Sequence, residues 1–158
     1  MKAISCHSCG APMRLLAGRD YFVCDHCTSF HFPEKNDDGV RVLGGTSGQA
    51  CPVCETDLSL GSVADCQVLT CPKCRGILAN QFSFALIVES LRAGRTEERL
   101  PRRRLSEAEL ARRIKCPGCG QTMDAHPYYG PGHVVVDSCG GCKLVWVDHG
   151  ELATISKT

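Results

Sequence analysis

The chain has 158 residues, 13 of them cysteine, and a formal charge of +1 when the cysteines are counted as neutral. A nearly neutral chain is not a polyelectrolyte partner for nucleic acid, so any such binding must come from a local patch. No apolar run reaches the length of a membrane span, and the first residues contain no apolar signal-peptide core. We therefore expect a soluble, cytoplasmic protein with reduced thiols and no membrane partner.

Twelve of the cysteines form six C-x-x-C pairs, and these pairs couple into three successive groups with internal gaps of 14, 16 and 19 residues. Such spacing is typical of four-thiolate zinc sites, so we predict three zinc ions, one per group. Rubredoxin-like iron uses the same geometry, and spacing alone leaves that alternative open. The predicted ligands are Cys6, Cys9, Cys24 and Cys27, then Cys51, Cys54, Cys71 and Cys74, then Cys116, Cys119, Cys139 and Cys142.

Metal binding changes both the stability and the charge of this chain. Modules of this size bury too little apolar surface to fold alone, so the metal-free protein should be largely unfolded. Binding deprotonates the thiols, and three four-thiolate zinc sites bring the formal charge from +1 to −5.

In chain order, the sequence predicts a first zinc ribbon over residues 1–33, a flexible linker over 34–50, and a second ribbon over 51–79. A helical, arginine-rich connector follows over 80–115, and a third ribbon with a short C-terminal helix covers 116–158. Runs rich in β-branched and aromatic residues predict a strand before the second cysteine pair of each ribbon, at 20–23, 66–70 and 133–137. The predicted fold is small, metal-stabilised and mixed α+β, with three tandem ribbons and helices between the second and third.

The helix signals lie mainly in the connector. Asn80 is a good N-cap for a helix that ends before Gly94, and Ser106-x-x-Glu109 is a capping box for a second helix. A third, short helix is expected to begin near Asp148.

Basic residues concentrate between residues 92 and 115, where nine Lys or Arg face four Glu. This local excess of +5 either contacts phosphates or forms a solvated helix face with glutamates nearby. The candidate nucleic-acid contacts are Arg102, Arg103, Arg104, Arg112 and Arg113.

The third ribbon carries Cys116-Pro117-x-Cys119, Cys139-x-x-Cys142 and Trp146-x-Asp148-x-Gly150-Glu151-Leu152. In these motifs it resembles the transcription-factor-IIB-type zinc-ribbon family. The resemblance is strongest over 116–155 and partial over 51–91, and it implies a ribbon fold and zinc, without a transcriptional role. Where the family usually has two glycines after the last cysteine, this chain has Lys143-Leu144.

Several side chains allow a structural or a functional interpretation. Trp146 either fills the core beside the metal or stacks on a nucleobase, and we favour the core. Asp148 and Glu151 fit a helix cap better than a catalytic pair. Cys66, the unpaired cysteine, is expected to be a small buried residue, with a reactive thiol or a spare ligand as the alternative. His7 and His26 are expected to be bystanders.

No nucleophile, base and orienting group come together in the sequence, so we predict no enzyme and no small-molecule substrate. The leading hypothesis is a zinc-binding interaction module, an adaptor or accessory protein with a protein partner. The alternative is a nucleic-acid-binding or transcription-associated protein that uses residues 92–115. A third possibility is zinc handling or redox sensing through a labile site.

Overall fold

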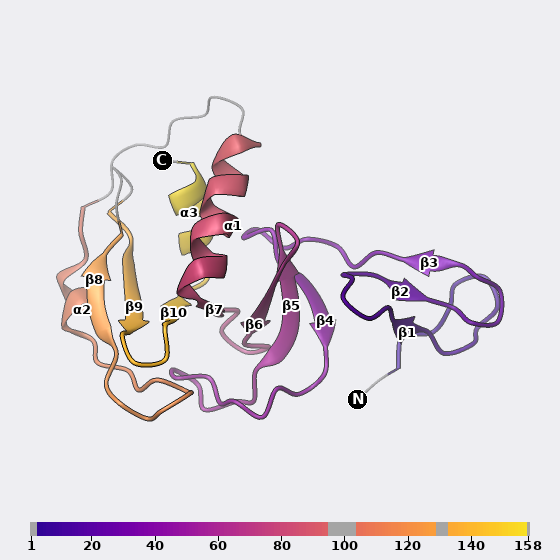
Figure 1. The fold of residues 1–158 in the computed structure, drawn as a ribbon, viewed down its shortest axis with the longest axis horizontal. Helices are drawn as coiled ribbons and strands as arrows, with labels where there is room; N and C mark the ends of the chain where they lie inside the picture. The colour runs from indigo at the N-terminus through magenta and orange to yellow at the C-terminus, as the bar shows by residue number, and fades with distance from the viewer. Residues whose placement is uncertain (1–2, 95–103, 129–132, 158) are drawn as a thin grey trace.

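Two β-sheets and three helices form the protein in the computed structural model, which describes residues 3–94, 104–128 and 133–157 (Figure 1). The first sheet has the order β1-β2-β3, and the second has the order β4-β5-β6-β7-β10-β9-β8. The strands are β1 (Arg14–Leu15), β2 (Phe22–Val23), β3 (Phe30–His31), β4 (Arg41–Gly44), β5 (Ser59–Val63), β6 (Cys66–Thr70), β7 (Ile77–Asn80), β8 (Asp124–Pro127), β9 (Val135–Cys139) and β10 (Leu144–Val147). The described residues are mostly β, whereas the sequence predicted a mixed α+β fold.

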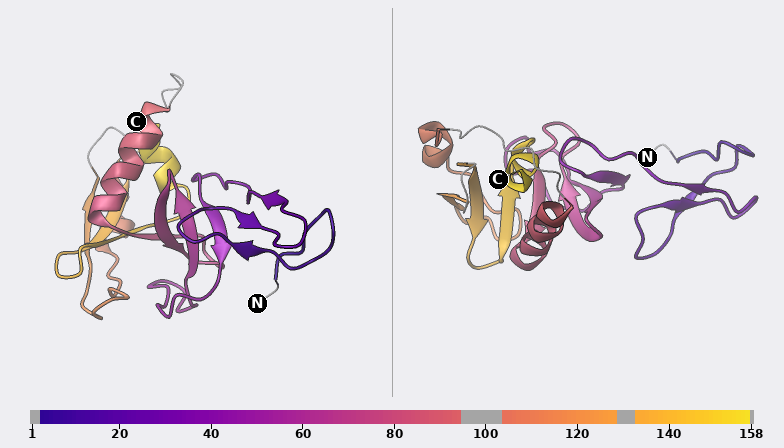
Figure 2. Two further views of the ribbon diagram at one scale, coloured as in Figure 1. Left: turned by 45° about the vertical axis from the view of Figure 1, so that its right-hand side comes forward. Right: turned by 90° about the horizontal axis from the view of Figure 1, so that it is seen from above.

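The first ribbon forms a module of its own. Its three short strands project away from the rest of the molecule in Figure 1 and in the view from above in Figure 2. Its core is small and consists of Cys6, Met13, Phe22 and Cys24, with Phe22 on the inner side of β2. A core of this size supports the expectation that metal binding stabilises the module.

The second and third ribbons, which follow each other in the chain as the sequence predicted, share one sheet. β7 and β10 pair antiparallel, with Leu144 opposite Asn80 and Val147 opposite Ile77. Leu78 and Trp146 lie opposite each other in this pairing, and each follows the first cysteine of its own knuckle by the same number of residues. A local two-fold axis therefore passes through this pair and relates β5-β6-β7 to β8-β9-β10.

The segment at 34–50, predicted as a flexible linker, is built into this body. The side-chain Oδ1 of Asn36 accepts hydrogen bonds from the backbone N–H groups of Asp38 and Val40 and so forms a tight turn. Val40 is fully buried in the main core, and β4 pairs with β5 at the edge of the sheet. The composition of this segment is typical of a loop, because its apolar residues are few and closely spaced, but the segment contains strand β4.

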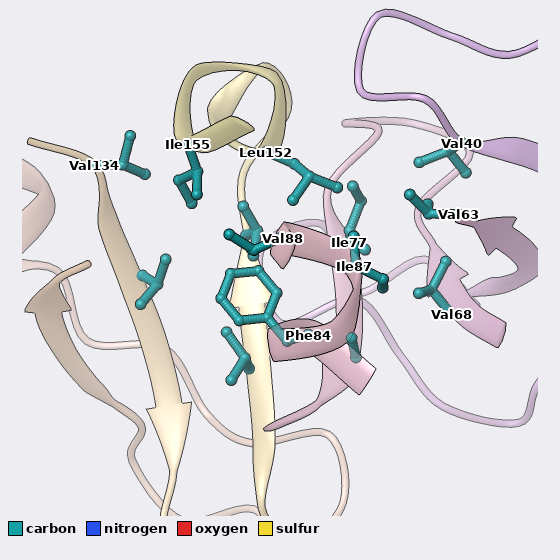
Figure 3. Packing of buried hydrophobic residues seen from close by; sticks show 14 residues of the cluster. Val40, Val63, Val68, Ile77, Phe84, Ile87, Val88, Val134, Leu152 and Ile155 are labelled. Atoms are coloured by element: carbon teal, nitrogen blue, oxygen red, sulfur yellow. The ribbon is translucent and has the colours of Figure 1, made fainter. Parts of the chain in front are cut away.

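Helices α1 (Gln81–Ala93) and α3 (Glu151–Ser156) contact each other over one face of the large sheet, and α2 (Glu107–Ala111) contacts β8. Asn80 Oδ1 caps α1 by accepting from Ser83 N, and Ser106 Oγ caps α2 by accepting from Glu109 N, as the sequence predicted. Figure 3 shows the core between α1, α3 and the sheet, where Phe84, Ile87 and Val88 meet Leu152 and Ile155.

Candidate metal centres

Three groups of four cysteines come together in the fold, and they are the three groups that the spacing predicted. In each group all four Sγ atoms lie within 4.8 Å of one another. The Cys6–Cys27 and Cys9–Cys24 Sγ distances are both 3.5 Å, and the Cys51–Cys74 distance is 3.7 Å. A tetrahedron with Zn–S bonds of about 2.3 Å has edges of about 3.8 Å. The donor atoms fit a zinc ion at each of the three sites.

Backbone N–H groups point at the sulfur atoms from within each knuckle of the second site. Val53 N and Cys54 N donate to Cys51 Sγ at 3.4 and 3.3 Å, and Lys73 N and Cys74 N both donate to Cys71 Sγ at 3.4 Å. Such bonds favour the charged thiolate over the thiol. Their arrangement prepares the cysteines for a dication.

The same effect is visible in the pKa values of thiols in the other two sites. In the first site, hydrogen bonds from the backbone of Cys9 and Ser8 lower the pKa of the Cys6 thiol to about 6. In the third site, a hydrogen bond from the backbone of Cys142 lowers the pKa of Cys139 to about 7. These cysteines are poised to bind zinc at neutral pH.

Every knuckle ends on a residue in the left-handed backbone region, four positions after its first cysteine. Sequence reasoning missed this feature, because only two of the six positions are glycine. The residues are Gly10, Thr28, Glu55, Arg75, Gly120 and Lys143. The position alone predicts the left-handed conformation, because C-x-x-C turns share one backbone conformation whichever residue stands four positions after the first cysteine.

The comparison with family models finds a match to the transcription factor zinc-finger family, a TFIIB-type zinc ribbon, over residues 115–157. Residues 115–157 are thus similar to the TFIIB-type zinc ribbons and are called the TFIIB-type ribbon. Comparison with curated proteins and with solved structures found no match. The family assignment therefore covers this ribbon, and the second ribbon is linked to it through the shared sheet.

The TFIIB-type ribbon departs from its family pattern at Lys143-Leu144, and the structure shows how the chain accommodates the change. Lys143 adopts φ 57°, the conformation that a glycine takes most easily. The turn is thus kept at the cost of local strain, because a side chain in this region is disfavoured by roughly 1–2 kcal/mol.

Trp146 of the TFIIB-type ribbon is a core residue, as favoured from the sequence. Its side chain is fully buried, and its Nε1 donates to Asp148 Oδ1 at 3.1 Å. A β-carbon added to Gly76 in the second ribbon would lie 2.2 Å from Cζ2 of the indole. The two ribbons therefore interlock, with the tryptophan of one filling the space that a glycine leaves in the other.

The predicted cap by Asp148 is wrong, because the N-cap of α3 is Gly150, which makes no side-chain cap hydrogen bond, and the Asp148 carboxylate accepts from Trp146 instead. The backbone N–H of Asp148 donates to Glu151 Oε2 at 2.8 Å. Burial raises the pKa of Glu151 to about 8. The Asp148 carboxylate contacts Trp146 and Arg112, and the Glu151 carboxylate contacts the backbone of Asp148.

The structure separates the candidate phosphate contacts into a paired arginine and exposed arginines. Arg112 Nη2 lies 2.7 Å from Asp137 and 2.8 Å from Asp148, so its charge is compensated within the TFIIB-type ribbon. Arg112 is therefore less available to a phosphate than the sequence suggested. Arg104 is exposed, and Arg113 is exposed while donating to the carbonyls of Leu110 and Arg112. Arg102 and Arg103 lie outside the described residues.

The remaining candidate ligands lie outside the metal clusters. Cys66 is half-buried against the main core and is absent from the three sulfur groups of the described residues. His7 and His26 are both exposed, and His7 contacts the ring of His31 at 5.8 Å. Within the described part of the chain, no helix has the length and apolar character needed to cross a membrane.

Proposed function

We propose that this protein is a non-enzymatic, zinc-stabilised adaptor that binds a protein partner through the outer face of α1. The observation that carries the proposal is the exposure of large apolar side chains on that face. Phe82 is 75% exposed and Leu86, one turn later, is 42% exposed. Exposed apolar side chains grouped on a helix are typical of interaction sites.

The inner face of the same helix explains why these residues are not needed for folding. Phe84, Ile87 and Val88 already bury the side that faces the sheet. Phe82 and Leu86 add apolar surface that the fold does not bury. A partner that covers this surface would gain binding free energy of roughly 25 cal/mol per Å² buried.

The metal sites support a structural rather than a catalytic role. Four thiolates fill the tetrahedral coordination of zinc, whereas a catalytic zinc keeps one position for water or substrate. Each of the three groups offers four cysteine sulfurs. The zinc ions then serve to hold the ribbon surfaces in place.

The test is affinity purification of the zinc-loaded chain from the cells that natively make it, compared with a Phe82→Gln/Leu86→Gln double variant. Glutamine keeps the helix propensity while removing the apolar surface. We expect a defined protein at a fixed ratio with the native chain and its loss with the double variant. Glu89→Gln, on the same exposed side of α1, is the matched control and should retain the partner.

Two results would contradict the proposal. One is the same set of proteins recovered with the native chain and the double variant. The other is recovery of nucleic acid alone, released by salt and lost when Arg104 and Arg113 become alanine, which would favour the basic stretch instead.

A further inference from the structure

The outer face of the first ribbon carries a cluster of aromatic rings. The ring of Tyr21 lies 5.8 Å from that of Phe30 and 4.9 Å from that of Phe32, measured between centroids. Phe30 and Phe32 are 62% and 55% exposed. Phe22, by contrast, is buried on the inner side. The cluster therefore contributes little to the core of the ribbon and leaves Phe30 and Phe32 largely exposed, with the Arg41 guanidinium 6.0 Å from the centroid of the Phe32 ring.

A cleft of about 700 Å³ lies between this ribbon and the seven-stranded sheet. Tyr21 and Phe32 line it from the ribbon, and Leu60 and Ser62 line it from β5. Its volume is in the range of ligand sites, and such sites commonly lie between modules. The lining combines aromatic faces with hydrogen-bonding groups, which suits a ligand that is neither purely apolar nor highly charged.

The charges around the cleft select among possible ligands. Residues 1–33 have three basic and two acidic side chains, and a four-thiolate zinc site contributes −2, so the module has a formal charge of −1. A polyanion such as nucleic acid is disfavoured there. Arg19 and Asp65 both line the cleft, and among the described residues neither forms an ion pair.

We propose that this cleft binds an extended, proline-rich segment of a protein partner that carries a lysine or arginine. The inference rests on the proposed adaptor function and names the chemistry of a second contact. Proline rings pack against the faces of Tyr21 and Phe32 in the way that aromatic-lined grooves bind polyproline II helices. The basic residue of the segment pairs with Asp65.

The backbone of such a segment also fits the polar lining. A polyproline II helix has no internal hydrogen bonds, so its carbonyl groups remain free to accept. Arg19 and the Gln67 amide supply donors in the cleft. The preformed conformation also lowers the entropy that the ligand loses on binding.

The test measures the fluorescence anisotropy of a labelled peptide of eight prolines and one arginine with the zinc-loaded full chain. A glycine–serine peptide of equal length, also with one arginine, is the control. We expect the proline peptide to bind at least tenfold more tightly, and Phe32→Ala to weaken it at least tenfold. Val42→Ala removes part of an exposed apolar side chain that does not line the cleft and should leave peptide binding unchanged.

Asp65→Asn gives a second, structurally mild test. Asp65 is exposed and has φ 62°, a conformation that asparagine tolerates. The substitution should weaken the arginine-containing peptide about fivefold or more and leave a peptide with alanine in that position unaffected. Retained zinc, counted by native mass spectrometry, shows that both variants are folded.

The proposal is overturned if the two peptides bind equally, or if folded Phe32→Ala and Asp65→Asn both bind as the native chain does. Tighter, salt-sensitive binding of an oligothymidine probe at Tyr21 and Phe32 would replace it with a nucleic-acid site. Recovery of a partner through α1 without peptide binding would refute only the cleft. Peptide binding without such a partner would refute only the α1 surface.

Discussion

Replacing Asp38 with alanine should strongly destabilise the body formed by the second and third ribbons. The Asp38 carboxylate is buried and accepts from Gly150 N at 2.8 Å, from Ala153 N at 2.9 Å and from His149 Nδ1 at 3.0 Å. It therefore caps α3 from a segment more than a hundred residues earlier in the chain. The substitution removes these bonds and leaves two backbone donors at the helix start without an acceptor.

The expected loss is about 3 kcal/mol, given about 1.5–3 kcal/mol for hydrogen bonds to a charged group and about 1 kcal/mol for a typical N-cap. For a chain of this size, that corresponds to a fall of roughly 6–12 °C in the midpoint of thermal unfolding. The assay is urea unfolding of the zinc-loaded protein, followed by the fluorescence of Trp146. This residue is the only tryptophan and is buried in the body concerned.

Asp37→Ala is the matched control, because Asp37 is the exposed neighbour of Asp38 in the same turn. The control should lie within about 0.5 kcal/mol of the native chain. If Asp38→Ala is no less stable than Asp37→Ala, the cap does not hold the segment to α3, and residues 34–50 act as the flexible linker that their composition suggested.

Three further predictions concern the shared sheet and the TFIIB-type ribbon. Gly76→Ala should lower the free energy of unfolding by about 3 kcal/mol or more, because the added methyl group overpacks Trp146. Gly140→Ala, where a β-carbon has open space, should be nearly neutral. Equal urea midpoints for the two variants would contradict the interlock. Lys143→Gly should raise the free energy of unfolding by about 0.5–1 kcal/mol by relieving the left-handed strain, and no gain over Lys143→Ala would refute it. Folding raises the pKa of Glu151 from 4.5 to about 8, so its contribution to stability is full below pH 4.5 and is lost as the pH rises to about 8. Between these pH values, the free energy of unfolding should fall more steeply for the native chain than for Glu151→Gln. Parallel curves of stability against pH would contradict the pKa shift.

Local patterns predicted the parts of the structure that depend on neighbouring residues. The metal clusters follow from cysteine spacing, and the caps at Asn80 and Ser106 follow from side chains that reach only three residues along the chain. The strand predicted at 66–70 is β6 with the same bounds, and the other two predicted strands overlap β2 and β9 with shifted ends.

The features that sequence reasoning missed depend on contacts between distant segments. Nothing local to Ile77–Asn80 indicates that it pairs with β10, because both strands are short and would also suit separate ribbons. Asp38 stands in a turn-like run of polar residues, and only the fold reveals its partner at Gly150. The partners of Arg112 likewise lie far from it in the sequence, and only the fold places Asp137 and Asp148 beside it.

The pairing of β7 with β10 also has a consequence for how the chain acquires its metal. Each strand directly follows the second knuckle of its own site, and the two strands hold each other in register. Zinc binding at either the second or the third site therefore orders a strand that the other site needs. Part of the conformational entropy of folding has then already been lost when the next zinc ion binds. The second and third zinc ions should load cooperatively, while the first ribbon, with a separate sheet and core, fills independently.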